Sequence, residues 1–519
     1  MSIPRRARRR AMACAVLAAT LVLPACGSGG GTNAALPGNT VQQQDSQPAG
    51  ASQTGSAAAQ PETGGAAATT TQAAQPEAAA KPAAQAGSST STTDNATKQT
   101  SAQPPAAAVK AAGPAGAGAA PAVAKATGKA PAKKAAPAAE GAGGAPKAKK
   151  EQPCVPATGS PVNIGNVGDY SGALADDFGP GADTIRVWAK ATNACGGLNG
   201  HQINLFVADD QSDPALALSQ TKTMVEQNHV IAFVGDYIFL TYGAVLPYLQ
   251  KVNIPLIGGD GYNDLWFSNP MAFPLEAGPN VGFYQSAMKL IPKPPEVTKG
   301  GGIYCNEEPI CQTSDNAAAR AYKEKGIQLV LQQPVSLSQP SYTAQCQALK
   351  EAGAQWIDHQ LTPAADIRFI KDCNRIGYHP HDFTIALGAS KLQEGDPLFD
   401  GLIVGQGVFP WPDESIPATK AAHDAVRKYD PGLTLGGAFS LSWASGELLR
   451  AASSFLTDAP TTAQLFQGLY SLKGETLNGL TGPLSFAQGA HLETTFAPCV
   501  FEVEIVHEKW SAPQGAKCV

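Results

Sequence analysis

The 519-residue chain is poor in aromatic residues (7%) and in charged residues (15%), and several catalytic motifs are missing from it. It has no Cys-x-x-Cys pair, which argues against zinc or redox chemistry. It also has no Gly-x-Ser-x-Gly elbow, no P-loop and no His-Glu-x-x-His helix. We therefore expect a protein that is not an enzyme and that needs no cofactor and no metal.

Large apolar side chains are nearly absent from residues 27–152, which consist almost entirely of Ala, Gly, Pro, Thr, Ser and Gln. Such a segment cannot offset the entropy that is lost when a backbone becomes ordered. We expect a disordered tether over residues 26–152, with a mean reach of about 60–70 Å as a flexible coil. Its basic end, residues 125–150, fits either contact with anionic envelope polymers or lipid head groups, or a merely solubilising charge.

No hydrophobic run is long enough for a comfortable transmembrane helix, because the apolar stretch 11–22 falls short of the roughly 20 residues required. Five arginines precede it, so residues 1–25 are typical of an export signal. The stretch ends in Leu23-Pro24-Ala25-Cys26, which resembles a bacterial lipobox. This predicts a lipoprotein held at the membrane by acylated Cys26, and the alternative is an ordinary cleaved signal with an incidental cysteine.

Basic residues are scarce in the part of the chain that can fold. Signal and tether hold 15 of the 37 basic and 5 of the 42 acidic residues, so residues 151–519 hold 22 and 37, a net charge of −15. A chain this acidic is a poor partner for nucleic acid. Its length also exceeds what one hydrophobic core usually serves, so two lobes are expected.

Eight cysteines remain once Cys14 in the signal and Cys26 are set aside. An even number in an exported chain indicates four disulfides rather than metal ligands, although sequence alone does not fix the pairing. Cys154 precedes the first expected strand and Cys195 ends the helix that returns antiparallel to it, so both lie at one end of the sheet. The disulfides we expect are Cys154–Cys195, Cys305–Cys311, Cys346–Cys373 and Cys499–Cys518.

The stretch 162–200 begins an alternating pattern of strands and helices. Residues 162–168 are short and apolar, which suits a strand buried on both faces, and a helix follows from about Asp177 until Gly196-Gly197. In such units ligands bind beyond the carboxyl ends of the strands, here the loop 169–178. Further strands are expected at 202–208, 230–234, 254–257, 302–304, 328–331, 356–358 and 383–387. Further helices are expected to begin at Ser212 or Asp213 and to lie near 316–325, 344–352 and 365–376.

This alternation predicts an α/β fold of two doubly wound lobes, with the strand ends facing a shared cleft. An ordered set of short motifs also resembles the type I periplasmic-binding-protein family, in particular the branched-chain amino-acid and amide binders of ABC importers. The resemblance covers nearly all of residues 160–510. The motifs are Gly168 with Ser171-Gly172, Asn193 to Gly200, Asp209-Asp210 with Asp213-Pro214, Val234-Gly235, Ile254-Pro255-Leu256-Ile257, and Leu480 to Gly489.

The resemblance implies a Venus-flytrap receptor, in which two lobes joined by three crossovers close on a small solute. Applied to this chain, residues 153–277 and 408–481 would form the N-terminal lobe. Residues 278–407 and 482–519 would form the C-terminal lobe. The partners implied are a small-molecule ligand, an ABC importer permease and the membrane reached through Cys26, with an extracytoplasmic location.

The family's amino-acid site is poorly matched here. Family members hold the ligand carboxylate with hydroxyl and backbone N–H groups after the third and fourth strands, but this chain has Ile238 and Phe239 where serines are usual, and only Thr241 keeps a hydroxyl. The positions that would hold the ammonium group fall near Ile310, Thr362 and Ser390, without a carboxylate.

An apolar, aromatic or neutral ligand therefore fits better than a standard amino acid. Alternatives stay open for single residues: Tyr237 and Phe239 as core, Asp169 and Asp260 as helix caps, and Phe409 with Trp411 as hinge packing. The candidate ligand-binding residues are Tyr170, Phe178, Tyr237, Phe239, Thr241, Asp260, Tyr262, Ile310, Thr362, Ser390 and Phe409.

Three histidines, His359, His379 and His381, invite a metal interpretation. His379 and His381 flank Pro380 in a turn, so solvated loop histidines are the favoured interpretation. The function we expect is solute capture for an ABC importer. A sensory or envelope-interaction lipoprotein on the same fold is the alternative, and an enzyme on this fold is a weaker one.

Overall fold

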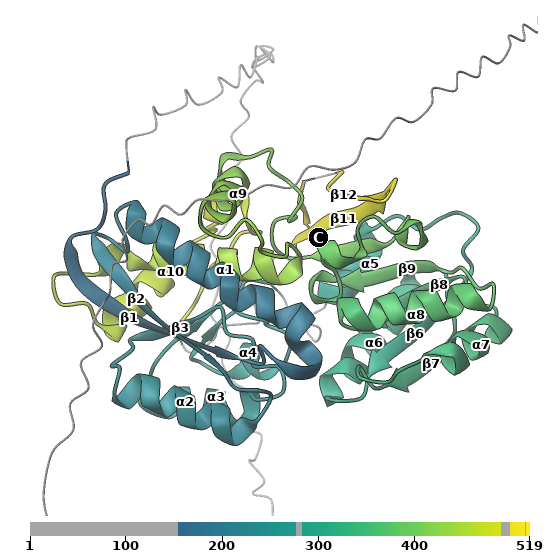
Figure 1. Ribbon diagram of the computed structural model, residues 1–519, viewed down its shortest axis with the longest axis horizontal. Coiled ribbons are helices and arrows are strands. Elements are labelled where there is room, and N and C mark those ends of the chain that lie inside the picture. The colour runs from purple at the N-terminus through teal and green to yellow at the C-terminus, as the bar shows by residue number, and fades with distance from the viewer. Residues whose placement is uncertain (1–153, 277–282, 489–498, 514, 519) are drawn as a thin grey trace, which may run out of the picture. The chain divides into compact units, whose positions relative to one another are not determined.

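The computed structural model describes residues 154–276, 283–488, 499–513 and 515–518 (Figure 1). The expected export signal 1–25, the lipidation site Cys26 and the tether 26–152 lie outside these ranges. Within the described residues, no helix combines the length and the apolarity that a membrane crossing requires.

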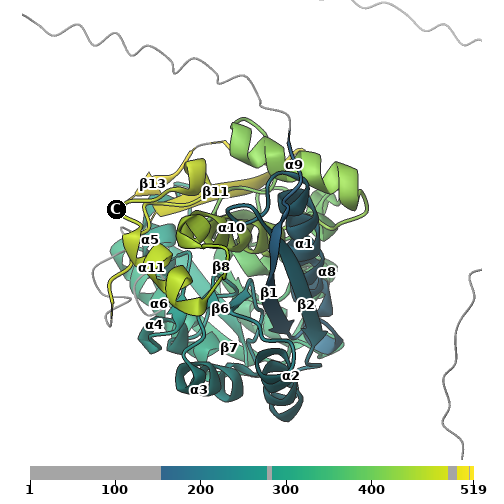
Figure 2. The same ribbon diagram turned by 90° about the vertical axis from the view of Figure 1, so that its left-hand side faces the viewer.

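The first lobe is built on five parallel strands in the order β2-β1-β3-β4-β5. Helix α1 packs with α10 and helix α2 packs with α3, so helices cover both faces of the sheet. In Figure 2, α1 and α2 lie on opposite sides of β1 and β2. The elements of this half of the chain are β1 (Gly159–Gly168), α1 (Ala175–Ala194), β2 (His201–Asp209), α2 (Pro214–Glu226), β3 (Ala232–Val234), α3 (Tyr242–Val252), β4 (Leu256–Ile257), α4 (Leu265–Ser268) and β5 (Ala272–Phe273).

The second lobe repeats this arrangement. Its strands follow the order β12-β11-β10-β9-β8-β6-β7, with β6 to β10 parallel and the late strands β11 to β13 antiparallel. The elements are α5 (Phe283–Leu290), β6 (Lys299–Cys305), α6 (Pro309–Glu324), β7 (Gln328–Val335), α7 (Thr343–Ala352), β8 (Trp356–Gln360), α8 (Pro363–Arg375), β9 (His381–Ile385), β10 (Ile403–Gln406), β11 (Cys499–Val506), β12 (Lys509–Ser511) and β13 (Lys517–Cys518).

Between β10 and β11 the chain returns to the first lobe. Helices α9 (Pro417–Tyr429), α10 (Gly437–Ala452) and α11 (Thr462–Ser471) lie there, and α9 and α10 both pack on α1. Counted within each lobe, the parallel strands share one order, 2-1-3-4-5, which places the topological switch point between β1 and β3 and between β6 and β8. In doubly wound sheets, ligands bind outside the carboxyl ends of the strands at this point.

Local sequence signals explain the start of α2 and the end of α1. The Asp213 carboxylate accepts hydrogen bonds from the N–H groups of Ala215 and Leu216, and Pro214 occupies the first turn of α2, which confirms the expected cap. Helix α1 ends at Ala194, and Gly196 and Gly197 follow with φ of 90° and 63°, the left-handed region that glycine adopts freely.

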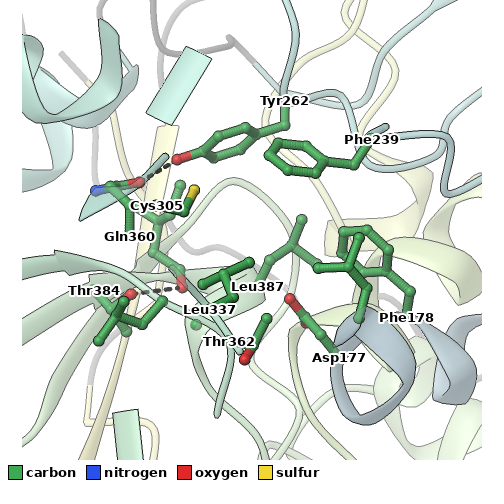
Figure 3. A pocket seen from close by; sticks show the side chains of 14 residues that line it. Asp177, Phe178, Phe239, Tyr262, Cys305, Leu337, Gln360, Thr362, Thr384 and Leu387 are labelled. Atoms are coloured by element: carbon green, nitrogen blue, oxygen red, sulfur yellow. Dashed lines mark hydrogen bonds between the residues drawn. The ribbon is translucent and has the colours of Figure 1, made fainter. Parts of the chain in front are cut away.

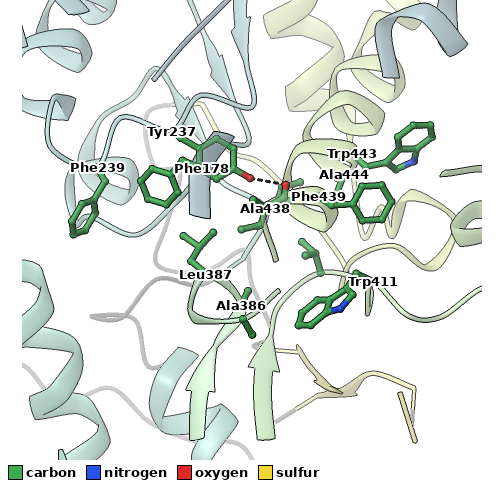
Figure 4. Packing of buried hydrophobic residues seen from close by; sticks show 14 of the residues in the cluster. Phe178, Tyr237, Phe239, Ala386, Leu387, Trp411, Ala438, Phe439, Trp443 and Ala444 are labelled. Carbon is green, nitrogen blue, oxygen red and sulfur yellow. Dashed lines mark hydrogen bonds between the residues drawn. The ribbon is translucent and has the colours of Figure 1, made fainter. Parts of the chain in front are cut away.

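Several boundaries differ from the expectation. The helix expected near 316–325 begins at Pro309, and the strand expected at 356–358 runs on to Gln360. The strand expected to run through residue 387 ends at Ile385, and a 3-10 turn spans Ala386–Gly388. Ala386 and Leu387 continue the apolar run in the sequence, but in the structure they form this turn and pack between the lobes. Figure 4 shows Leu387 facing Phe178 and the loop of Tyr237, with Ala386 beside Trp411.

All four expected disulfides are confirmed: Cys154–Cys195, Cys305–Cys311, Cys346–Cys373 and Cys499–Cys518. Each joins neighbouring elements. The first ties the start of β1 to the end of α1, the second ties the end of β6 to α6, the third ties α7 to α8, and the fourth ties β11 to β13.

Candidate functional site

A cavity lies where the carboxyl ends of the strands of both lobes meet (Figure 3). Its volume is about 50 Å³, which exceeds the roughly 10–15 Å³ that a cavity needs to hold one water molecule. The first lobe contributes Leu174, Asp177, Phe178, Phe239 and Tyr262. The second lobe contributes Cys305, Leu337, Gln360, Leu361, Thr362, Thr384, Ile385, Leu387 and Gly388.

Aromatic rings form the wall on the side of the first lobe. Phe178 comes from the first turn of α1, Phe239 from the loop after β3, and Tyr262 from the loop after β4. The Phe178 and Phe239 ring centroids are 6.3 Å apart, and those of Phe239 and Tyr262 are 5.6 Å apart, both with edge-to-face geometry. The three rings therefore present one continuous apolar surface to the cavity.

The position of Tyr262 depends on a sharp turn after β4. Gly258 and Gly259 both have positive φ, and a side chain on Gly259 would meet the carbonyl oxygen of Asp236 at 2.4 Å. Only glycine fits such a close approach of two backbone segments. The turn aims the following residues, including Tyr262, at the second lobe.

Two polar side chains in the lining lack a full set of partners. The Tyr262 hydroxyl donates a hydrogen bond to Oε1 of Gln360 across the lobes, while Nε2 of Gln360 is buried and has no hydrogen-bond partner among the described residues. Asp177 is likewise without a hydrogen-bond partner in the described chain, and burial raises the pKa of its carboxyl well above the usual range, with Asp176 and Asp260 adding repulsion. The cavity thus offers one carboxyl that favours the neutral form. The unpaired amide nitrogen of Gln360 is covered by protein in this closed arrangement.

Fixed positive charge is missing from this lining. Among the described residues that line the cavity, none is Lys, Arg or His. An ionised carboxylate on a ligand would therefore be buried without a counter-ion, which is costly. The arrangement favours a ligand that is uncharged and apolar over most of its surface.

Four expected site residues line the cavity: Phe178, Phe239, Tyr262 and Thr362. Thr362 is also the N-cap of α8, where its hydroxyl oxygen accepts the N–H of Ala365. The aromatic residues that the sequence indicated after the first, third and fourth strands of the first lobe thus come together.

Four more expected residues lie behind the cavity wall. Tyr170 donates a hydrogen bond to Asn166, and Tyr237 donates one to the carbonyl oxygen of Ala438 at 2.8 Å, which ties the loop to α10. The Thr241 hydroxyl donates to a carboxylate oxygen of Asp210 at 2.8 Å. None of these three contributes to the lining residues of the described cavity.

Asp260 also lies behind the wall, where it joins two loops. Its two carboxylate oxygens accept the N–H groups of Ile238 (2.9 Å) and Tyr262 (3.0 Å), so it holds together the loops that carry Phe239 and Tyr262. Burial raises the pKa of Asp260 to about 7, and the two backbone hydrogen bonds partly oppose this. Asp260 is therefore a positioning residue.

The remaining expected residues have packing or backbone roles. Ile310 is buried in the first turn of α6, and the Phe409 ring packs 5.8 Å from that of Phe439. The Ser390 hydroxyl oxygen accepts the N–H of Leu392, and the backbone of Ser390 pairs with Gly436. These three residues are outside the cavity lining in the described chain.

Sequence reasoning missed Asp177, Gln360, Thr384 and Leu387. Asp177 lay within the loop 169–178 expected to bind ligand but was not singled out as a site residue, and Gln360 follows the segment expected as a strand by two residues. A systematic search of the residues just after each expected strand would have found Gln360, because such positions face the cleft in doubly wound sheets. Leu387 was expected as the last residue of a strand and would have escaped this search.

Comparison with known proteins agrees with this architecture. The family described as periplasmic binding protein matches residues 161–501. An amino acid binding protein of Pseudomonas aeruginosa is 37% identical over 79 residues, which is 15% of this chain and 20% of that protein. The chain thus matches about a fifth of the length of this relative.

Two solved structures show the same fold. A branched chain amino acid ABC transporter protein from Thermus thermophilus, with bound valine, has a TM-score of 0.61 at 17% identity and covers 69% of this chain and 97% of that one. A fatty acid ABC transporter substrate-binding protein from Thermomonospora curvata has a TM-score of 0.59 at 16% identity, with coverages of 70% and 95%. Because the family match spans most of the folded chain and both lobes share this topology, the protein belongs to the periplasmic binding protein family, with the type I fold.

Proposed function

We propose that this chain is an extracytoplasmic substrate-binding protein that captures a small apolar, aromatic or neutral molecule between its lobes and delivers it to an ABC importer. Membership of the periplasmic binding protein family supports the solute-binding role. The cavity lining, which is apolar and aromatic and has no basic side chain in the described chain, supports the ligand class. This lining is the observation that carries the proposal.

The proposed ligand carries one hydrogen-bond acceptor, such as a carbonyl oxygen. Nε2 of Gln360 has no hydrogen-bond partner in the described chain and is covered by protein while Oε1 accepts from the Tyr262 hydroxyl, so opening of the lobes would expose it to such an acceptor. Asp177, in its neutral form, can donate to or accept from a second polar group. A zwitterionic amino acid would leave its carboxylate without a cation and is disfavoured.

We also propose the division of the lobes, with residues 153–277 and 408–481 in the first and 278–407 and 482–519 in the second. β5 is the last strand before the chain crosses from the first lobe to the second, and β10 is the last strand before it crosses back. The two strands belong to different sheets, which supports this division. The cavity is small and has walls from both lobes, so a ligand enters when the lobes open by hinge motion.

Anchoring through Cys26 belongs to the same proposal, with the tether 26–152 holding the lobes outside the cytoplasmic membrane. The lipobox-like stretch Leu23-Pro24-Ala25-Cys26 supports it. Mass spectrometry of the mature protein should find a lipid on Cys26 as the N-terminal residue, and Cys26→Ala should release the protein from membranes. An unmodified N-terminus beyond Cys26 would contradict the anchor without touching the ligand proposal.

The ligand class is tested by thermal shift and calorimetry with a panel of aromatic acids, amides, neutral aromatics, short fatty acids and amino acids. A ligand at 100 times its Kd adds about 2.7 kcal/mol of stability. Phe239→Ala should weaken binding by about 10–100-fold through lost apolar contact. Gln360→Ala should weaken it by about 5-fold for a carbonyl-bearing ligand.

Phe455→Ala serves as the matched control. Phe455 is 36% exposed and outside the cavity lining, so its removal should leave affinity unchanged. Tight binding of a zwitterionic amino acid, with no response to the apolar and neutral compounds, would overturn the proposed ligand class.

A further inference from the structure

A second group of polar side chains lies inside the second lobe, separate from the cavity lining. His359 is on β8, Asp366 is in the first turn of α8, and Asp382 is on β9. Parallel pairing of β8 with β9 places Ile357 opposite Asp382, so His359 and Asp382 point to the same face of the sheet, which α8 covers. The topology brings one imidazole and two carboxyl groups to a single point.

These groups are enclosed by protein. The side chains of His359 and Asp366 are fully buried, and that of Asp382 is 7% exposed. Both ring nitrogens of His359, Oδ1 of Asp366 and both carboxyl oxygens of Asp382 have no hydrogen-bond partner of standard geometry among the described residues. Native proteins rarely leave so many buried polar atoms unpaired, so the cluster calls for a specific occupant.

Two of the three distances between the candidate ligand atoms match a metal site, and all three lie within 4.8 Å. Nε2 of His359 is 3.4 Å from Oδ1 of Asp366 and 3.4 Å from Oδ1 of Asp382. A tetrahedral zinc ion with bonds of about 2.0–2.1 Å to nitrogen and oxygen holds its ligand atoms about 3.3–3.4 Å apart. The unpaired Oδ2 of Asp382 offers a further ligand atom.

The charges point the same way. Two carboxylates beside a neutral imidazole sum to −2, and a divalent cation cancels this charge inside the protein. Gln393 donates a hydrogen bond to Oδ2 of Asp366 at 2.8 Å, which leaves Oδ1 directed at the cluster, as outer partners of metal ligands do.

We propose that His359, Asp366 and Asp382 bind a divalent transition-metal ion, zinc in the first place, as a structural site behind the floor of the ligand cavity. The site contacts two residues of the cavity lining. The Thr384 hydroxyl, in the cavity lining, donates to the carbonyl oxygen of His359, and Gln360 follows His359 directly on β8. Zinc therefore braces the strands that present Gln360 and Thr384.

The test uses the untagged mature protein, stripped with a chelator and titrated with zinc chloride. We expect one zinc ion per chain by elemental analysis and a higher Tm. Asp382→Asn should lower zinc affinity by more than about 100-fold, because changes to outer partners of metal ligands alone cost 10–100-fold. Gln393→Ala removes an outer partner of Asp366 and should therefore lower zinc affinity by about 10–100-fold. His381→Gln is the matched control, since His381 is exposed beside Asp382 and pairs with Glu296, and it should bind zinc as the wild type does.

X-ray absorption of the zinc-loaded wild type keeps the proposal testable if Asp382→Asn does not fold. The expected spectrum has one imidazole nitrogen and carboxylate oxygens at about 2.0–2.1 Å. A sulfur shell, several imidazoles, or zinc content that is the same in the wild type and in Asp382→Asn would overturn the site. Failure of the wild type to take up zinc would also overturn the site. A proton shared between the carboxyl groups would then be the occupant of the cluster.

Discussion

The buried carboxyl of Asp260 gives the protein a pH-dependent stability that one substitution should remove. Asp260 is 2% exposed, and its pKa is raised from 3.8 to about 7 because burial disfavours the charged form. Above its folded pKa the group is ionised inside the protein, whereas the unfolded chain ionises it in water. Its contribution to stability is therefore fully present below pH 3.8 and is lost as the pH rises through about 7.

The size of the effect follows from the two pKa values. A pKa unit corresponds to about 1.4 kcal/mol, so a rise from 3.8 to about 7 corresponds to about 4 kcal/mol in all. Between pH 5 and pH 8 the part that is lost is about 2.5 kcal/mol. Asp260→Asn cannot ionise, so this part of the pH dependence should vanish in the variant.

The assay is urea unfolding of the wild type and of Asp260→Asn at pH 5 and pH 8. Other buried carboxyl groups titrate in both proteins, so the observable is the difference between their two pH responses. The asparagine also places an NH₂ group opposite a backbone N–H of Ile238 or Tyr262, and this costs about 1–3 kcal/mol at every pH. A constant offset of this kind cancels in the difference.

Asp458→Asn, at an exposed position, controls for the loss of a carboxyl group as such. The reasoning is refuted if wild type and Asp260→Asn lose the same stability between pH 5 and pH 8. It is also refuted if the wild type loses less than the variant, since burial would then stabilise the ion.

Two further outcomes follow from packing and from the disulfides. Gly446→Ala in α10 should destabilise the protein by about 1–3 kcal/mol, because the new methyl carbon would lie 2.3 Å from the Trp188 ring. Gly243→Ala in α3 has open space around it and should stabilise the protein by up to about 1 kcal/mol. The urea midpoints of the two variants must therefore move in opposite directions. Replacing both cysteines of Cys346–Cys373 by alanine should lower the free energy of unfolding by about 3.5 kcal/mol, and replacing those of Cys305–Cys311 should lower it by about 2 kcal/mol. The first disulfide closes a loop of 27 residues and the second a loop of 6, and the longer loop gains more from closure. Equal losses would contradict this reasoning.

Much of the fold could be predicted because its signals are local. Asp213 followed by Pro214 marks a helix start through hydrogen bonds within one turn, and Gly196-Gly197 marks a helix end through backbone conformation alone. Alternating strands and helices imply parallel sheets, and parallel sheets bring strand ends to one edge. The same logic placed Phe178, Phe239 and Tyr262 at the site, since each lies just after a strand or in the first turn of the helix that follows one.

Side-chain direction could not be predicted in the same way. Tyr237 and Phe239 are two residues apart in one loop, yet Tyr237 turns back to bond the carbonyl of Ala438 while Phe239 faces the cavity. Thr241 kept the hydroxyl expected of a ligand contact, but this hydroxyl donates its hydrogen bond to Asp210, which directly follows β2.

The amino-acid sequence by itself determined the two-lobed α/β architecture and the edge where the cavity lies, because both depend on the order of elements along the chain. It indicated four disulfides, and the tertiary structure fixed their pairing. Only the tertiary structure decided which polar groups are left unpaired. Asp177 and Gln360 face the cavity, and His359 meets Asp366 and Asp382, because packing brings together side chains from separate elements. Burial then removes the water that would have satisfied them, and this is what makes these few positions chemically distinct.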